Sequence, residues 1–286
     1  MRYPWGVQFA RDFAQNSRMP IPDILALDFD GVLCDGMREY FETSRRTYAR
    51  VWPREPAPAD DSLAAFRRLR PVILSGWEMP LLLRAIARGV PETDVLQGWE
   101  KVRDELARET GRPDRDGLIH LLGTTLDQVR REWIAADRAG WVAFNEPYGP
   151  LDDVRRLIAE PPQALVVTTK EGEFTRVILD TWNVKMADVQ GKEAGIHKCE
   201  NLRALIHAHE SAKGSHPRIW FVEDRLETLE HVTTHEDLSD VGLYLATWGY
   251  NTEETRARAQ GNPRIHLLKL EEFKNGLQHW PQDRNT

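Results

Sequence analysis

The stretch ILALDFDGVLCDG, residues 24–36, runs from apolar residues straight into two acids that are separated by one residue. These acids are Asp28 and Asp30, and Gly31 follows at once. Acidic side chains are poor strand formers and costly to bury, so they are unexpected inside a buried strand. In open parallel sheets, however, functional groups gather at the carboxyl ends of strands. We therefore predict a strand that ends at the two acids, with Gly31 allowing the chain to turn sharply away.

Further apolar runs bounded by turn residues alternate with helix-like stretches along the rest of the chain. They lie at residues 164–169, 218–224, 241–249, 264–270 and, more weakly, 186–190. Strands alternating with helices indicate parallel βαβ units, and continuous hydrophobicity fits strands covered on both faces. The predicted fold class is therefore α/β, with a doubly wound parallel sheet.

The segment after the first strand has a different character. It carries amphipathic helical patterns, and only PVILS, residues 71–75, is typical of a strand there. We therefore predict two parts: an α/β core formed by residues 1–35 and 160–286, and a mostly helical insertion at residues 36–159.

The bulk composition restricts the class of protein. The chain has 286 residues, of which 41% are hydrophobic and 29% charged, as expected for a globular protein with a sizeable core. The net charge of −7 argues against a nucleic-acid or anionic-membrane surface. No apolar run approaches membrane length and the first residues lack a signal-peptide core, so a cytoplasmic location is expected. Cys34 and Cys199 have no zinc-ligand spacing in the sequence.

Two carboxylates at a strand end can hold Mg²⁺, a hard ion that prefers oxygen ligands. One of them could then attack phosphorus while the other passes a proton to the leaving group. The alternative is that Asp28 merely ends a strand and Asp30 opens a turn.

Three later segments favour the chemical interpretation. ALVVTTKEG offers the hydroxyls of Thr168 and Thr169 at a strand end, and Lys198 directly precedes a predicted helix. IWFVEDRLETL ends a strand in a second acidic pair, Glu223 and Asp224.

The order of these four motifs resembles that of the haloacid dehalogenase-like (HAD) superfamily. In that family a DxDG motif is followed by an apolar run ending in Thr or Ser, then by a lysine, then by an acidic pair. The VEDR form of the last motif is most similar to the β-phosphoglucomutase and phosphoglycolate phosphatase branch. The resemblance covers roughly residues 21–35 and 160–275. It implies a Rossmannoid catalytic core, with the helical insertion acting as a cap domain.

The resemblance also implies a role for each motif residue. Asp28 would be the nucleophile and a Mg²⁺ ligand, and Asp30 the general acid and base, binding the metal through its backbone carbonyl. The phosphoryl group would be held by Thr168, with Thr169 beside it, and by Lys198. The acidic pair, Glu223 and Asp224, would complete the magnesium shell.

The sequence leaves several assignments open. Lys192 competes with Lys198 for the third motif, and Lys198 is favoured because a helix follows it immediately. Lys170 could contact phosphate, although a lysine after a strand is commonly solvated. Ser75, in VILSG, could replace Thr168 in the second motif. The family often has an aspartate four positions after the metal ligand, where this chain has Thr228.

The expected activity is that of a Mg²⁺-dependent phosphatase acting on a small phosphorylated metabolite through an aspartyl-phosphate. A phosphomutase of the same chemistry and a catalytically silent ligand-binding or partner-binding scaffold are the alternatives. A dehalogenase is disfavoured because that branch lacks the second acid, present here as Asp30. Phosphonate hydrolysis would need a cap lysine, and Lys101 is the only lysine of residues 36–159. The sequence predicts neither the substrate nor the oligomeric state.

Overall fold

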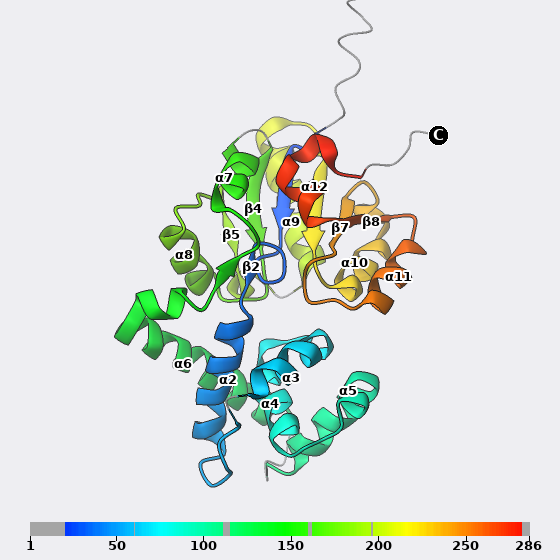
Figure 1. The fold of residues 1–286 in the computed structure, drawn as a ribbon. Coiled ribbons are helices and arrows are strands. Elements are labelled where there is room, and N and C mark those ends of the chain that lie inside the picture. The colour runs from blue at the N-terminus through cyan, green and yellow to red at the C-terminus, as the bar shows by residue number, and fades with distance from the viewer. Residues whose placement is uncertain (1–20, 60, 111–114, 160–161, 196, 282–286) are drawn as a thin grey trace, which may run out of the picture.

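A six-stranded parallel sheet forms the centre of the molecule (Figure 1). The computed structural model describes residues 21–59, 61–110, 115–159, 162–195 and 197–281. In spatial order the strands are β5 (Val189–Gln190), β4 (Gln163–Val167), β1 (Ile24–Leu27), β6 (Ile219–Glu223), β7 (Gly242–Ala246) and β8 (Ile265–Leu268). The predicted doubly wound α/β fold is confirmed. The parts of the predicted core at residues 1–20, 160–161, 196 and 282–286 lie outside the described residues.

Alternate residues of β1 face opposite sides of the sheet, as strand geometry requires. Leu25 and Leu27 belong to one buried apolar cluster, and Ile24 and Ala26 to another. Helices on both sides of the sheet supply further side chains to these clusters. The first cluster contains residues of the end of α6 (Arg115–Val142), α7 (Leu151–Ala159), α8 (Gly172–Thr181) and α12 (Leu270–Asn275), and the second contains residues of α9 (Lys198–Lys213), α10 (Leu226–Thr233) and α11 (Glu253–Gln260). Both faces of the sheet are therefore covered.

A separate group of helices follows the first strand, on the side where β1 ends (Figure 1). It contains α2 (Met37–Val51), α3 (Ser62–Leu69), α4 (Met79–Ala87), α5 (Glu92–Arg108) and the first part of α6 (Arg115–Val142). Their apolar side chains form a third buried cluster, which extends to Leu126. We call residues 37–126 the helical block. A short antiparallel pair, β2 (Cys34–Asp35) and β3 (Glu146–Pro147), lies where the chain leaves and re-enters the core.

Two details differ from the sequence prediction. Residues 71–75 do not form a strand: their first two residues belong to the short 3₁₀ helix η1 (Arg70–Val72), and η2 (Gly76–Glu78) follows directly after the segment. The buried side chains of α7, Val154 and Leu157, pack with the sheet although they fall within the predicted insertion. Among the described residues, no helix combines the length and apolar character that crossing a membrane requires.

A buried ion pair fastens α2 to α6. The carboxylate of Glu39 accepts hydrogen bonds from Arg130 Nε at 2.8 Å and Nη2 at 3.0 Å, and also from the side chains of Thr43 and Trp141. Although burial opposes ionisation, Arg130 keeps the pKa of Glu39 low, at about 2. Glu39 is fully buried and Arg130 is 5% exposed, so each depends on the other for compensation of its charge.

We predict that Glu39→Ala lowers the free energy of unfolding by about 3–5 kcal/mol, because it leaves the buried Arg130 guanidinium with only the more distant carboxylate of Asp127, 3.8 Å away. Chemical denaturation of the variant and the natural protein measures the difference. Glu146→Ala is the matched control, since Glu146 pairs with Arg38 at the surface and its loss should change stability by about 0–1 kcal/mol. Equal effects of the two substitutions would contradict the importance of the buried pair.

Candidate active site

The register between β1 and β6 brings the acidic residues together. Leu27 pairs with Val222, and Asp28 donates its backbone N–H to the carbonyl of Val222 at 2.9 Å. Asp28 therefore follows β1 beside the end of β6, where Glu223 and Asp224 lie. One carboxylate oxygen from each of these three acids lies within 4.8 Å of the other two. All three side chains are buried.

Lys198 supplies positive charge to this cluster. It is the first residue of α9, and its Nζ lies 2.8 Å from Asp28 Oδ1 and 3.5 Å from Glu223 Oε2. The same ammonium donates to the carbonyl of Val167 at the end of β4. Although burial alone would lower it, the two carboxylates raise the pKa of Lys198 above its ordinary value. Lys198 is therefore held in its charged form against Asp28.

The single positive charge of Lys198 does not neutralise the negative charge of three buried carboxylates. Burial, followed by the nearby Glu223, raises the pKa of Asp28 to about 7 despite Lys198. Burial also raises the pKa of Glu223 to about 7, and the pKa of Asp224 is raised by burial and by Asp28. Close, buried carboxylates of this kind are suited to a hard divalent cation with oxygen ligands. The donor set of this site therefore fits Mg²⁺.

Glycines allow the chain to approach Asp224 closely. Gly31 has φ +88°, and a Cβ added there would lie 2.2 Å from Asp224 Oδ2. A Cβ at Gly249 would lie 2.3 Å from the Cβ of Asp224. The backbone N–H of Tyr250 donates to Asp224 Oδ2 at 2.6 Å. The glycine that follows the two acids in the sequence is thus required both for the turn and for the position of Asp224.

Asp30 points to a different partner. Its Oδ1 accepts from Lys170 Nζ at 3.1 Å, and this ammonium lies 5.2 Å from the centre of the Tyr40 ring. Lys170 is 7% exposed, so it is not the solvated lysine that its position after a strand suggested. Thr168 is buried, and its hydroxyl accepts from the backbone N–H of Lys170 at 3.2 Å. Thr169 is exposed at the edge of the same pocket.

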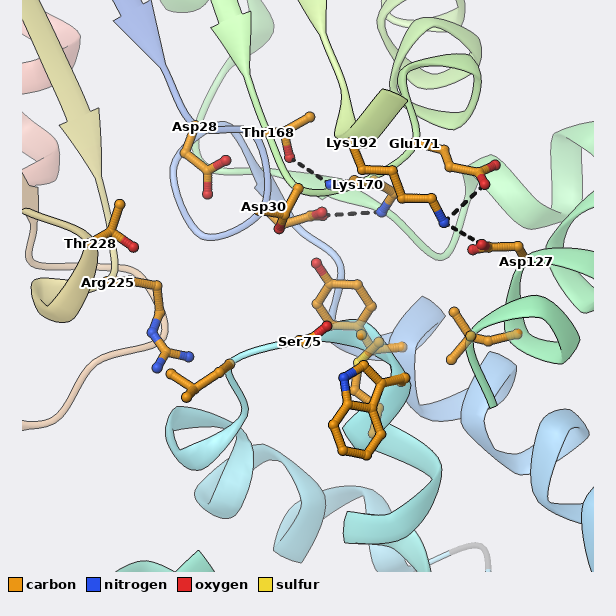
Figure 2. A pocket seen from close by; sticks show the side chains of 18 of the residues that line it. Asp28, Asp30, Ser75, Asp127, Thr168, Lys170, Glu171, Lys192, Arg225 and Thr228 are labelled. Carbon is orange, nitrogen blue, oxygen red and sulfur yellow. Dashed lines mark hydrogen bonds and ion pairs between the residues drawn. The ribbon is translucent and has the colours of Figure 1, made fainter. Parts of the chain in front are cut away.

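The sequence-predicted residues and the helical block enclose one pocket with a cavity of about 240 Å³. Figure 2 shows Asp28, Asp30 and Thr168 on the core side and Ser75 on the side of the helical block. Lining residues from both sides are Asp28, Asp30, Thr168, Thr169, Lys198, Glu223 and Asp224, with Tyr40, Arg70, Ser75, Trp77 and Asp127.

The competing lysine occupies another part of the pocket wall. Lys192 forms an ion pair with Glu171 at 2.9 Å and another with Asp127 of α6 (Figure 2). Lys198, by contrast, contacts Asp28 directly. Ser75 lines the pocket from a loop, so it does not occupy the strand end that the second motif requires.

At the position of Thr228 the family often has an aspartate, and the neighbouring Glu227 does not supply a carboxylate in its place. Thr228 lines the pocket, whereas Glu227 turns away and pairs with Arg258 at 3.0 Å. The carboxylate of Glu227 is therefore engaged in an exposed ion pair outside the carboxylate cluster.

Sequence reasoning missed Arg70 and Tyr250. The Arg70 guanidinium lies 5.1 Å from the ring centre of Tyr40 and 4.7 Å from that of Tyr250, and it lines the pocket. Its Nε is buried without a hydrogen-bond partner among the described residues. An arginine near the end of an amphipathic helix is usually solvated, so no local signal marked this one.

Comparison with solved structures identifies the architecture. A predicted phosphoglycolate phosphatase from Haemophilus somnus is similar with a TM-score of 0.56 and 12% identity, over 90% of this chain and 99% of that one. A predicted phosphatase from Clostridium acetobutylicum has a TM-score of 0.55 and 13% identity, over 90% and 98%. A haloacid dehalogenase-like family protein from Streptococcus pneumoniae has a TM-score of 0.51 and 14% identity, over 88% and 96%.

The chain has the HAD-like fold. The predicted resemblance is therefore confirmed at the level of structure. No family model matches the sequence, and no curated protein matches it either. At such low identity the similarity lies in the strand order and the helical insertion, and it shows the fold alone.

The raised carboxylate pKa values predict a pH-dependent stability of the metal-free protein. A carboxyl whose pKa is raised from 3.8 to about 7 on folding, as for Asp28, stabilises the fold at low pH. This contribution is lost as the pH rises through about 7. Asp28→Asn, which stays neutral, should therefore raise Tm in EDTA at about pH 8 and much less at about pH 5. Each 1 kcal/mol corresponds to about 2–4 °C in chains approaching this size.

Thermal unfolding with EDTA and with Mg²⁺ measures this effect. Mg²⁺ should raise the Tm of the natural protein more than that of Asp28→Asn, because the ion offsets the clustered charge. Asp152→Asn is the control, since that side chain is 87% exposed. A Tm difference between the natural protein and Asp28→Asn that does not change with pH would contradict the proposed charge crowding.

Proposed function

We propose that this protein is a Mg²⁺-dependent phosphatase that acts on a small phosphorylated metabolite through an aspartyl-phosphate on Asp28. The observation that carries the proposal is the Asp28 carboxylate, held 2.8 Å from the Lys198 ammonium inside a cluster of buried acids. Among the similar structures are proteins described as phosphatases, which supports the same chemistry here.

Asp28 would attack the phosphorus atom and displace the leaving-group oxygen. Lys198 neutralises negative charge on both the nucleophile and the phosphoryl group, and the Thr168 hydroxyl donates to a phosphoryl oxygen. These interactions supply orientation and electrostatic stabilisation, which dominate phosphoryl transfer. A Mg²⁺ ion held by Asp28, Asp224 and Glu223 would supply further charge neutralisation.

Asp30 would transfer the protons. It protonates the leaving oxygen in the first step and then removes a proton from the water that attacks the aspartyl-phosphate. Lys170 is a positioning residue in this account, because its ion pair at 3.1 Å fixes the direction of the Asp30 carboxylate. In a phosphomutase, a substrate hydroxyl would replace the water.

The cap side of the pocket would hold the rest of the substrate. Arg70 and Ser75 offer hydrogen-bond donors and Trp77 an aromatic surface, while the core residues face them. A cavity of about 240 Å³ suits a small molecule rather than a macromolecule.

We expect Mg²⁺-dependent release of phosphate from a generic aryl phosphate, abolished by chelator and by Asp28→Asn. A broad panel of phosphorylated metabolites then identifies the substrate class. Turnover that persists in Asp28→Asn would refute the proposed nucleophile. A complete lack of turnover across the panel would favour a binding scaffold, and isomerised sugar phosphate without free phosphate would favour a mutase.

The two lysines provide a second test. Lys198→Ala should lower kcat by at least about 10²–10³-fold, because it removes a charge that contacts the nucleophile. Lys192→Ala should retain most of the turnover, since Lys192 pairs with Asp127 and Glu171 instead. The assay is initial-rate kinetics on the best substrate of the panel. The reverse order of effects would overturn the assignment of Lys198.

A further inference from the structure

A second group of metal-ligating side chains lies on the core, apart from the carboxylate cluster. Cys199 follows Lys198 in the first turn of α9, and His231 and His235 lie at and just beyond the end of α10. The Cys199 sulfur and one ring nitrogen from each histidine all lie within 4.8 Å of one another. Cys199 has no zinc-ligand spacing in the sequence, because His231 lies 32 positions further along the chain.

The fold creates this convergence. Residues four apart at a helix end lie on one face, and the rings of His231 and His235 meet edge to face with centres 4.9 Å apart. Helices α9 and α10 cover the same side of the sheet, which brings this face against Cys199. Cys199 is buried, His235 is half-buried and His231 is exposed, so the cluster opens toward solvent.

His235 has an unused polar atom. Its Nε2 is buried and makes no hydrogen bond among the described residues. Such an atom is costly to bury unless it obtains a partner. Its Nδ1 lies 3.0 Å from Arg203 Nη2, and Arg203 also donates twice to Asp237. Because a guanidinium only donates, Nδ1 accepts from Arg203 in the neutral ring and Nε2 carries the proton. For His235 to bind an ion, the ring has to release Arg203 and the proton has to leave Nε2, while the two hydrogen bonds to Asp237 still hold the guanidinium.

We propose that Cys199, His231 and His235 bind a borderline-soft divalent ion, Zn²⁺ above all. A thiolate and two imidazoles form a donor set that suits Zn²⁺, in contrast to the oxygen-only cluster of Asp28, Glu223 and Asp224. Three protein ligands leave the fourth tetrahedral position to water on the exposed side, next to His231. An ion bound there ties the start of α9 to the end of α10.

The proposed metal site lies next to Lys198 of the candidate active site. Lys198 precedes Cys199 directly, and its ammonium contacts Asp28. A metal ion on Cys199 would therefore anchor the turn of helix from which Lys198 extends. The ion would stabilise that turn of helix and would take no part in phosphoryl transfer.

Cobalt absorption provides a direct test on the full chain without a histidine tag. Co²⁺ substitutes for Zn²⁺ and gives an intense charge-transfer band only when a thiolate binds it. The chain contains two cysteines, so the band can be assigned by substitution. We expect a band that Zn²⁺ removes, that excess Mg²⁺ leaves intact and that disappears in Cys199→Ser.

Cys34→Ser is the matched control and should keep the band, since Cys34 is buried in another cluster near Asn145. His231 is exposed, and His231→Asn removes a proposed ligand. The substitution should therefore weaken Co²⁺ binding by more than the loss of a residue that only supports a ligand, which costs about 10–100-fold in affinity. Absence of the band in the natural protein, its survival in Cys199→Ser, or unchanged affinity in His231→Asn would overturn the proposal. Asp28→Asn should keep the band, so the outcome is independent of the proposed phosphatase activity.

Discussion

The repulsion among three buried carboxylates is the constraint around which this molecule is organised. Asp28, Glu223 and Asp224 meet because β1 and β6 are parallel neighbours in a fixed register. Burial raises the pKa of each of them; Lys198 offsets part of that effect for Asp28 and Glu223, and Arg225 offsets part of it for Asp224. Such an unfavourable arrangement persists only where several surrounding contacts hold it in place. Here the close approach of Gly31 and the backbone hydrogen bonds to the acids provide that restraint.

The helical block completes the site from the opposite side. Its attachment rests on the buried pair of Glu39 and Arg130, which joins α2 to α6. Arg70, from the short helix η1, lies near the rings of Tyr40 and Tyr250 at the pocket wall. Charge from the helical block thereby faces charge from the core across a small cavity. In the proposed phosphatase, such an arrangement would allow binding energy from the rest of the substrate to be used at the reacting centre.

Much of the core could be predicted from the sequence because its signals are local. An apolar run ending in Asp28 predicts a strand and its carboxyl end, and Thr168 and Asp224, which follow similar runs, line the same pocket as Asp28. Residues 71–75 were mistaken for a strand because a short apolar run does not distinguish a strand from a buried loop. The buried positions of Arg70 and Lys170 could not be predicted, since both depend on contacts with residues distant in the sequence.

The most direct test of the account is whether Asp28 itself becomes phosphorylated during turnover. The protein is mixed with an aryl phosphate and Mg²⁺, quenched in acid within one turnover, digested and analysed by mass spectrometry. The account predicts a phosphoryl group on the peptide that contains Asp28, absent when the ion is chelated and absent in Lys198→Ala. Rapid turnover with no phosphoryl group on Asp28, or with the group on another residue, would contradict it.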